Sequence, residues 1–442
     1  MRRTLLLAPA VLSAIALAVT APNTGATTTG TVAWEPPVLV TDTQGAREMS
    51  MVLDPTNEQR MFACTPSGLQ NPHSQSHYFQ TADGGDSWTY TDVETDPDDT
   101  RTQLSEGGDC DVAYDSAGTM YVADTWVGNL SVGTSRDGGA TWTGTALAVN
   151  VPVVDRPWLV APGAPGVVYV TYQALQGQMP TLMWFTKSTD YGRTFSPAVP
   201  ITTANLDGTY TWEGNVVTSP DGQDIYLIHS RRVTPAQYGL PDLIQLAYSH
   251  DGGTSWRTRT VETLPAPTTP GTLYPGIAMD AGGHLHAVWS APRDTHGDVP
   301  VYYTTSADKG VTWSEPIVTG TTWTAWAPWV AGGRTAGEAA IAWLGTPSAT
   351  PREASPWYFG YATVSAGAIT ASGTTTEAPM FTGVQTYPEF QAIRYDSTGR
   401  LHLGMAVFGP SGTWSLYYQR QALPTATASP SPTAMRRGRG RG

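Results

Sequence analysis

The stretch "SRDGGATW", Ser135–Trp142, recurs along the chain and decides the fold. Four further stretches share its form, Ser/Thr-x-Asp-x-Gly-x-Ser/Thr-aromatic: "TADGGDSW" (81–88), "STDYGRTF" (188–195), "SHDGGTSW" (249–256) and "SADKGVTW" (306–313). Their aspartates are Asp83, Asp137, Asp190, Asp251 and Asp308, so successive copies lie 54, 53, 61 and 57 residues apart. A nearly constant period of this length indicates a repeat architecture.

Each copy of the motif has the chemistry of a hairpin turn. Alternating apolar runs precede and follow it, as in "LIQLAYS" (243–249) and "RTRTVET" (257–263), which is typical of paired strands. The aspartate can accept hydrogen bonds from the following backbone, and the glycine can adopt φ > 0. We therefore expect the five aspartates to be structural rather than catalytic.

A second unit recurs upstream of the motif: an apolar strand, a glycine turn and another apolar strand, as in "DVAYDSAGTMYVAD" (111–124). Each period then holds four antiparallel strands, which is the content of one β-propeller blade. The sequence predicts an all-β propeller of seven blades. Six blades is the alternative, because "TVSAGAIT" (363–370) replaces the motif in the sixth unit.

The two ends of the repeat region are expected to pair. The stretch "WEPPVLVTD" (34–42) resembles the fourth strand of a blade, "WSEPIVTG" (313–320), and the last unit lacks a fourth strand. We predict that the N-terminal strand completes the last blade, which removes the exposed edges of an open ring.

The chain divides into three parts. Residues 1–26 have a basic start, an apolar run and small residues up to Ala26, which predicts a cleaved signal peptide and a secreted, extracellular protein. The apolar run is too short for a stable membrane insertion, although an uncleaved anchor is the alternative. Residues 27–422 form the propeller, and the Pro/Ser/Thr-rich and Arg-Gly tail at 423–442 is expected to be disordered.

Export permits a disulfide, and the two cysteines are placed to form one. Cys64 ends a second strand and Cys110 begins the next inner strand, so both are expected near one face of adjacent blades. The net charge of −13 excludes a nucleic-acid partner for the main body. We expect a monomer.

The five motifs resemble the Asp-box, or BNR repeat, of the sialidase superfamily of β-propellers. The resemblance covers essentially the whole mature chain and implies a propeller that acts on, or binds, an extracellular acidic glycan. It also implies a search for the sialidase roles: a tyrosine nucleophile with a glutamate base, an aspartate acid and an arginine cluster that holds the sugar carboxylate.

The topology limits where these roles can lie. The Asp-boxes occupy one face of the ring, so the loops that lead into the inner strands lie on the other face, where binding residues usually occur. The resemblance then implies Tyr387 as nucleophile, Glu213 as base and Asp155 as acid, with Asp109 the alternative acid. The expected substrate-binding residues are Arg47, Arg156, Arg231, Trp158 and Trp212.

One departure from the family pattern affects these assignments. The Phe/Tyr-Arg-Ile-Pro stretch typical of sialidases is absent, and "AREMSM" (46–51) stands in its place. Two other readings of the same fold therefore stay open: a polysaccharide lyase, and a non-catalytic propeller that binds glycan or an extracellular protein. Asp155 and Arg156 could also serve only to pair with each other.

No metal site and no cofactor is expected, with one exception. The acidic run from Asp92 to Asp111 could hold calcium, because hard oxygen ligands suit that ion. A solvated loop is the alternative, since the run lacks the spacing of an EF-hand.

Overall fold

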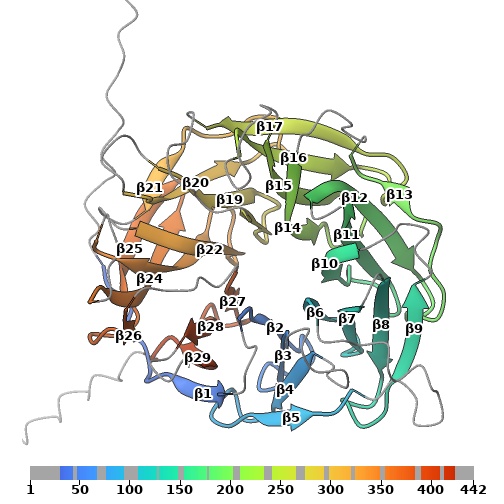
Figure 1. Ribbon diagram of the computed structural model, residues 1–442, viewed down its shortest axis with the longest axis horizontal. Helices are drawn as coiled ribbons and strands as arrows, with labels where there is room; N and C mark the ends of the chain where they lie inside the picture. Colours follow the sequence, from blue (N-terminus) through green and yellow to red (C-terminus); the bar gives the residue numbers. More distant parts are fainter. Residues whose placement is uncertain are drawn as a thin grey trace, which may run out of the picture.

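The structure is a computed structural model that describes residues 30–42, 47–66, 76–93, 108–126, 129–147, 154–176, 179–202, 210–232, 241–264, 274–292, 298–319, 324–348, 354–383, 390–408 and 413–423. These residues form seven antiparallel sheets arranged as a ring, which is a seven-bladed β-propeller (Figure 1). The predicted fold and blade count are confirmed. The described residues contain no helix, and so none that could cross a membrane.

The first four blades follow one another along the chain, each from the inner strand outward. Blade 1 holds β2 (Ser50–Leu53), β3 (Met61–Thr65), β4 (His77–Thr81) and β5 (Thr89–Thr91). Blade 2 holds β6 (Cys110–Tyr114), β7 (Met120–Trp126), β8 (Asn129–Ser135) and β9 (Thr143–Leu147). Blade 3 holds β10 (Val154–Val160), β11 (Val168–Gln176), β12 (Met179–Ser188) and β13 (Val199–Pro200). Blade 4 holds β14 (Tyr210–Thr218), β15 (Ile225–Arg232), β16 (Leu243–Ser249) and β17 (Arg257–Thr263).

The last three blades include the degenerate sixth unit and the closing strand. Blade 5 holds β18 (Gly276–Met279), β19 (Leu285–Ser290), β20 (Val301–Ser306) and β21 (Ile317–Thr319). Blade 6 holds β22 (Thr324–Gly332), β23 (Ala339–Thr346), β24 (Pro356–Ser365) and β25 (Ala368–Thr374), and β26 (Phe381–Thr382) also pairs with β24. Blade 7 holds β27 (Ala392–Tyr395), β28 (Leu401–Phe408), β29 (Trp414–Arg420) and β1 (Val38–Thr41).

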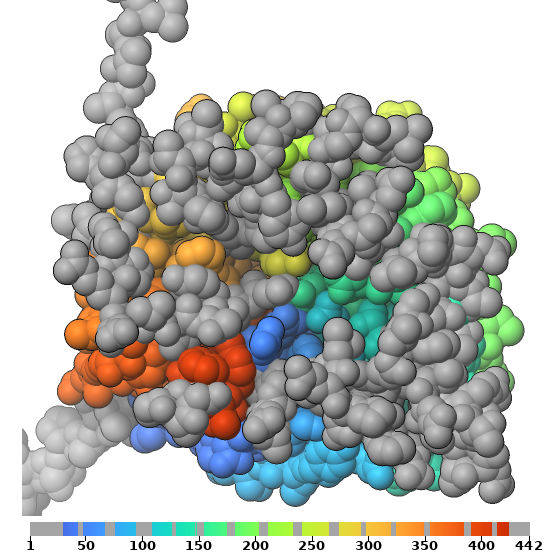
Figure 2. All heavy atoms as spheres, in the orientation of Figure 1, coloured from blue at the N-terminus to red at the C-terminus, as the bar shows by residue number. Residues whose placement is uncertain are grey.

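The ring closes as the sequence predicts, because β1 pairs antiparallel with β29. An ion-pair cluster reinforces the pairing: the Glu35 carboxylate accepts a hydrogen bond from Arg420 Nε at 2.6 Å and another from Arg400. Arg420 also contacts Asp86 of the first Asp-box at 2.6 Å. The first and last blades consequently lie side by side, blue against red in Figure 2.

All five Asp-boxes form the same hydrogen-bonded turn between the third and fourth strands of a blade. Asp137 Oδ1 accepts hydrogen bonds from the Ser135 hydroxyl (2.8 Å) and the Thr141 amide (2.9 Å), while Oδ2 accepts one from the Thr141 hydroxyl (2.6 Å). These bonds lower the pKa of Asp137 to about 2. The same contacts surround Asp83, Asp190, Asp251 and Asp308. This geometry gives the aspartates the structural role that their recurrence predicts.

The sixth blade makes its outer turn without an Asp-box. Ala366 (φ 50°) and Gly367 (φ 78°) form a two-residue turn between β24 and β25. Two consecutive positive φ values are typical of the tight turns that match strand twist. The missing motif therefore changed the turn and left the blade intact.

The Asp-boxes also join neighbouring blades. The second glycine of the fourth box, Gly253 (φ 85°), lies against Phe185 in the third strand of blade 3, and a Cβ there would be 2.0 Å from the ring. Gly85 of the first box meets Tyr418 of blade 7 in the same way. Each turn is thus a contact between blades as well as a link between strands.

Cys64 and Cys110, the pair expected from the sequence, form a disulfide between blades 1 and 2. The cysteines are 46 residues apart, and closing a loop of that length restricts the unfolded chain by about 4 kcal/mol in the chain-entropy account. The predicted signal peptide at 1–26 and the tail from 424 onward lie outside the described residues.

A glycine-to-alanine comparison tests the role of the box glycine. Gly253 and Gly283 have nearly equal φ values, 85° and 82°, but a Cβ at Gly283 meets nothing within 4 Å. We expect Gly283→Ala to cost about 1 kcal/mol from backbone strain alone. Gly253→Ala should cost about 3 kcal/mol, because overpacking against Phe185 adds to that strain. Urea unfolding measures both; equal losses would contradict the inter-blade contact.

Candidate functional site at the ring axis

The residues that lead into the inner strands converge at the ring axis, on the face opposite the Asp-boxes. Figure 1 shows the inner strands, among them β2, β6, β10 and β14, around the centre of the ring. Seven polar or aromatic residues at these strand starts carry the site: Glu48, Asp109, Asp155, Arg156, Glu213, Tyr274 and Phe390. We call Glu48, Asp109, Asp155, Arg156 and Glu213 the axial cluster.

An irregularity in β10 directs Arg156 into this cluster. The pairing with β11 shifts register between Asp155 and Trp158, and Arg156 has φ 51°, an uncommon conformation for a non-glycine residue. Such bulges bend a strand and re-aim its side chains. Strand β22 has the same register shift, with Ala327 at φ 48° in the position that corresponds to Arg156. The bulge therefore recurs in blade 6 without an arginine.

The Arg156 side chain is held on several sides and is only 4% exposed. Its Nη1 donates to Glu48 Oε2 at 2.7 Å, and Nη2 lies 3.5 Å from Asp109 Oδ2. The guanidinium also covers the rings of Phe390 (4.7 Å) and Tyr274 (4.8 Å). The one positive charge of the axial cluster is therefore matched by two carboxylates and two ring faces.

Asp155 holds a proton more strongly than an ordinary aspartate. Burial raises its pKa to about 7, and the negative charge of Asp109, which is hydrogen-bonded to it, adds to the increase. Gln173 Nε2 donates to Asp155 Oδ2 at 3.3 Å. A carboxyl that titrates near neutrality can both donate and accept a proton, which is the property required of a general acid.

Glu213 is fully buried, and burial raises its pKa well above the ordinary value. Among the described residues, neither of its carboxyl oxygens has a hydrogen-bond partner of normal geometry. Its backbone amide donates to Gln173 Oε1 at 3.2 Å. Gln173, only 1% exposed, thus connects Asp155 with Glu213 and fixes their separation.

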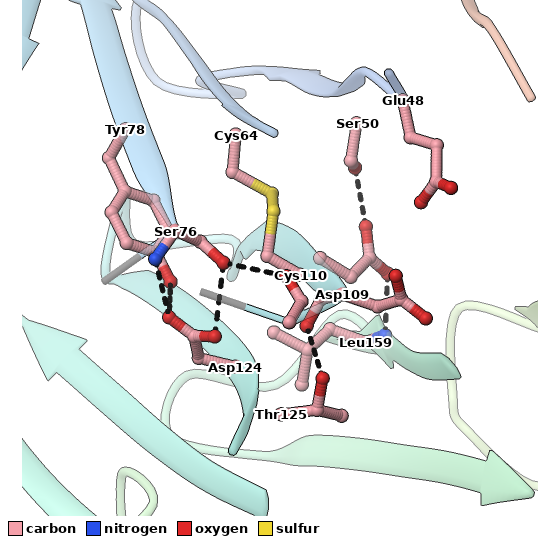
Figure 3. Close-up of a disulfide and its surroundings, with 12 residues drawn as sticks. Glu48, Ser50, Cys64, Ser76, Tyr78, Asp109, Cys110, Asp124, Thr125 and Leu159 are labelled. Atoms are coloured by element: carbon pink, nitrogen blue, oxygen red, sulfur yellow. Dashed lines mark hydrogen bonds between the residues drawn. A yellow bond between two sulfur atoms is a disulfide. The ribbon is translucent and has the colours of Figure 1, made fainter. Parts of the chain in front are cut away.

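A buried polar network fixes the backbone at Asp109 (Figure 3). The Asp109 carbonyl accepts hydrogen bonds from the Thr125 amide (3.0 Å) and hydroxyl (3.2 Å), and the next residue, Cys110, is tied to Cys64. Beside the disulfide, Asp124 accepts hydrogen bonds from the Tyr78 hydroxyl (3.0 Å) and the Ser76 amide (3.2 Å). The disulfide and this network together hold one carboxylate of the axial cluster in place.

Four of the residues expected to carry function meet in the axial cluster: Asp155, its alternative Asp109, Arg156 and Glu213. Arg47 is exposed, and Arg231 lies on β15, the second strand of blade 4, beside the buried His229. Among the described residues neither Arg47 nor Arg231 forms an ion pair with the axial cluster, and their substrate-binding role stays a prediction. Tyr387, the expected nucleophile, lies outside the described residues.

The two expected stacking residues belong to the core. Trp158 is 4% exposed and stacks on Trp329 at 5.4 Å, while Trp212 is 1% exposed. A buried ring has no free face for a sugar, so we correct their assignment from substrate binding to packing.

Gln173 and Phe390 were not recognised as site residues from the sequence. Gln173 is a polar residue inside the apolar run of β11, "VYVTYQALQ" (168–176), and that interruption is a usable signal. Phe390 gives no such signal, because its position under Arg156 depends on how blades 3 and 7 face each other. The calcium reading stays a prediction: most of the run lies outside the described residues, which hold no cluster of metal-ligand type.

Comparisons with known proteins agree with this architecture. The family model described as "BNR repeat-like domain" matches residues 17–287. An α-L-arabinofuranosidase of Fusarium graminearum superposes with a TM-score of 0.51 at 12% identity, covering 88% of this chain and 97% of its own. NanB sialidase of Streptococcus pneumoniae gives a TM-score of 0.43 at 11% identity, covering 88% and 70%. No curated protein sequence gives a significant match.

The Arg156–Glu48 pair should contribute strongly to stability, because both side chains are almost completely buried. Arg156→Met removes the guanidinium that contacts Glu48 and Asp109 and is expected to cost about 3–5 kcal/mol. Adding Glu48→Gln should recover part of that loss, since it removes one of the two negative charges that Arg156 contacts. Urea unfolding measures the cycle, with Arg257→Met on an exposed arginine as a control expected within about 0.5 kcal/mol of wild type. Strictly additive losses would contradict a direct pairing.

Proposed function

The chain belongs to the BNR repeat-like domain family, and from this premise we propose that it is a glycan-acting propeller that hydrolyses glycosidic bonds at the ring axis. The observation that carries the proposal is the Asp155 carboxyl, whose pKa is raised to about 7, beside the carboxyl of Asp109, both next to Arg156. Hydrolysis of a glycoside commonly needs one carboxyl that donates a proton and one that is ionised.

The axial cluster separates these two roles by environment. Burial and the neighbouring Asp109 raise the pKa of Asp155 to about 7, so Asp155 is suited to protonate the leaving oxygen. Glu48 and Asp109 lie against the Arg156 guanidinium, which favours their ionised forms. Their charge can stabilise the positive charge that develops on the sugar ring, and Glu213 keeps a second proton nearby.

The charge of the cluster favours a neutral glycan as substrate. Four carboxyl groups surround one guanidinium, and two of them already occupy that guanidinium. The carboxylate of a sialic acid would be repelled there unless residues outside the described part of the chain supplied more arginines. The sialidase-type reading, with Tyr387 as nucleophile, is therefore the second choice within the same class of reaction.

The fold comparison is consistent with this choice. The Fusarium arabinofuranosidase that shares the fold was observed with an iminosugar inhibitor, and a protonated iminosugar is a cationic sugar analogue. A surplus of carboxylates is the environment that such a cation prefers.

Removal of the proposed acid is the direct test. We expect wild-type protein to release the aglycone from neutral aryl glycosides, with α-L-arabinofuranoside in the panel, and to leave an aryl α-sialoside intact. Asp155→Asn should lower kcat/KM at least about 100-fold, because it removes the proton donor. Glu377→Gln, on an exposed carboxyl outside the axial cluster, is the control and should leave the rate unchanged.

Three results would each replace the proposal with another reading. Sialoside turnover that is lost in Tyr387→Phe would indicate a sialidase. A new ultraviolet absorbance from a uronate polysaccharide would indicate a lyase. Glycan binding without turnover of any substrate would indicate a binding propeller.

The pH profile supplies an independent check on Asp155. Since the acid must be protonated, kcat/KM should be level below pH 7 and fall as the pH rises through about 7. Asp109→Asn removes the negative neighbour, which lowers the pKa of Asp155 and should move the falling limb to lower pH. A limb that stays in place or moves to higher pH would contradict the pairing of these two groups.

A further inference from the structure

The ring axis contains a second chamber on the Asp-box side. Trp158, Trp329 and Phe390 pack against one another with ring centroids 5.0–5.6 Å apart, and we call these three rings the aromatic floor. On the Asp-box side of this floor lies a cavity of about 470 Å³ that is lined by residues of all seven inner strands. Its volume lies within the range of small-molecule sites.

The walls of this chamber combine apolar and polar surface in similar amounts. Every inner strand contributes aliphatic or aromatic side chains to them, among them Val52, Val160, Val216, Ile277 and Val330. The lining extends to Pro55 and Glu58, in the turn after β2 on the Asp-box face. A ligand that fills the chamber therefore needs an apolar body.

Arg394 lines the chamber with a positively charged guanidinium, and few of its hydrogen-bond donors are used within the described residues. Its Nη1 donates to the Ile393 carbonyl at 2.8 Å, and among the described residues it has no ion pair within 4 Å. A guanidinium carries five N–H donors, so most of them remain for a ligand.

The carboxylate that interacts electrostatically with Arg394 already accepts hydrogen bonds from other residues. Asp111 interacts electrostatically with Arg394, but its Oδ2 accepts the Leu159 amide at 2.6 Å and its Oδ1 accepts the Ser50 hydroxyl. Glu58 is bound to Ser397 at the mouth of the chamber. The two carboxylates of the lining are thus engaged elsewhere, and neither neutralises the guanidinium by contact.

We propose that this chamber binds a small amphiphilic monocarboxylate, with its carboxylate on Arg394 and its apolar tail against the walls. A guanidinium binds a carboxylate through two parallel hydrogen bonds, and an apolar wall around the pair strengthens them. A simple inorganic anion would leave the walls without a partner, and a neutral apolar molecule would leave the Arg394 donors unused. The proposal is independent of glycoside hydrolysis, because no residue of the axial cluster lines the chamber.

Calorimetric titration of the full-length protein with hexanoate tests the proposal. We expect one site, with affinity at least about tenfold greater than for hexanol or inorganic phosphate. Hexanol lacks the carboxylate, and phosphate lacks the apolar tail. Arg394→Met should weaken hexanoate binding at least about tenfold, and Arg257→Met on an exposed arginine should leave it unchanged. No binding, or equal binding by Arg394→Met, would overturn the proposal.

A second variant keeps the test decisive if Arg394→Met does not fold. Asp111→Asn removes the negative charge that acts on Arg394 and is expected to tighten hexanoate binding about threefold or more at pH 7.5. An unchanged or weaker affinity would overturn the proposal. Because these measurements use no glycoside, failure of the hydrolytic function leaves their outcome unaffected.

Discussion

The pairing of β1 with β29 is the contact on which the geometry of the axis depends. The strands of a propeller blade pack mainly against the two neighbouring blades, so an open ring could splay and move its inner strands apart. Here the Glu35 carboxylate joins Arg400 and Arg420, and Arg420 reaches the Asp-box of blade 1. Blades 1 and 7 are thereby fixed relative to each other. Glu48 from blade 1 and Phe390 from blade 7 can then approach Arg156 of blade 3 across the axis.

A closed ring concentrates charge, because seven strand starts meet in a small volume. Arg156 adopts a strained φ and is buried, both of which are unfavourable alone. The arrangement persists because Glu48, Asp109 and two aromatic rings surround the guanidinium. Asp155 is buried in the same crowded volume beside Asp109, and both effects raise its pKa to about 7, although the charge of Arg156 opposes them. The acid character of Asp155 is therefore a consequence of burial and of its acidic neighbour.

The fold was predictable from the sequence and the site was predictable only in part. An Asp-box is a local turn whose residues all lie within eight positions. The turn, the spacing of its copies and the face of the ring on which they lie can therefore be identified without any structure. The axial cluster instead joins residues of four blades, from Glu48 to Glu213, and it requires the bulge at Arg156. Trp158 and Trp212 illustrate the limit, because an aromatic side chain beside a charged residue suits a sugar platform and a core equally well. Pairing in the strands decides between them, and that pairing was not visible in the residues around each tryptophan.

The aromatic floor gives the axis two environments of opposite character. On one side, Arg156 is surrounded by acids and the surplus charge is negative. On the other side, Arg394 lines the chamber and the nearby Asp111 is occupied by Ser50 and Leu159. Phe390 contacts both: its ring lies under Arg156 and also lines the chamber that holds Arg394. Since no residue of the axial cluster lines the chamber, each arginine can serve its own ligand, a developing sugar cation on one side and an anion on the other.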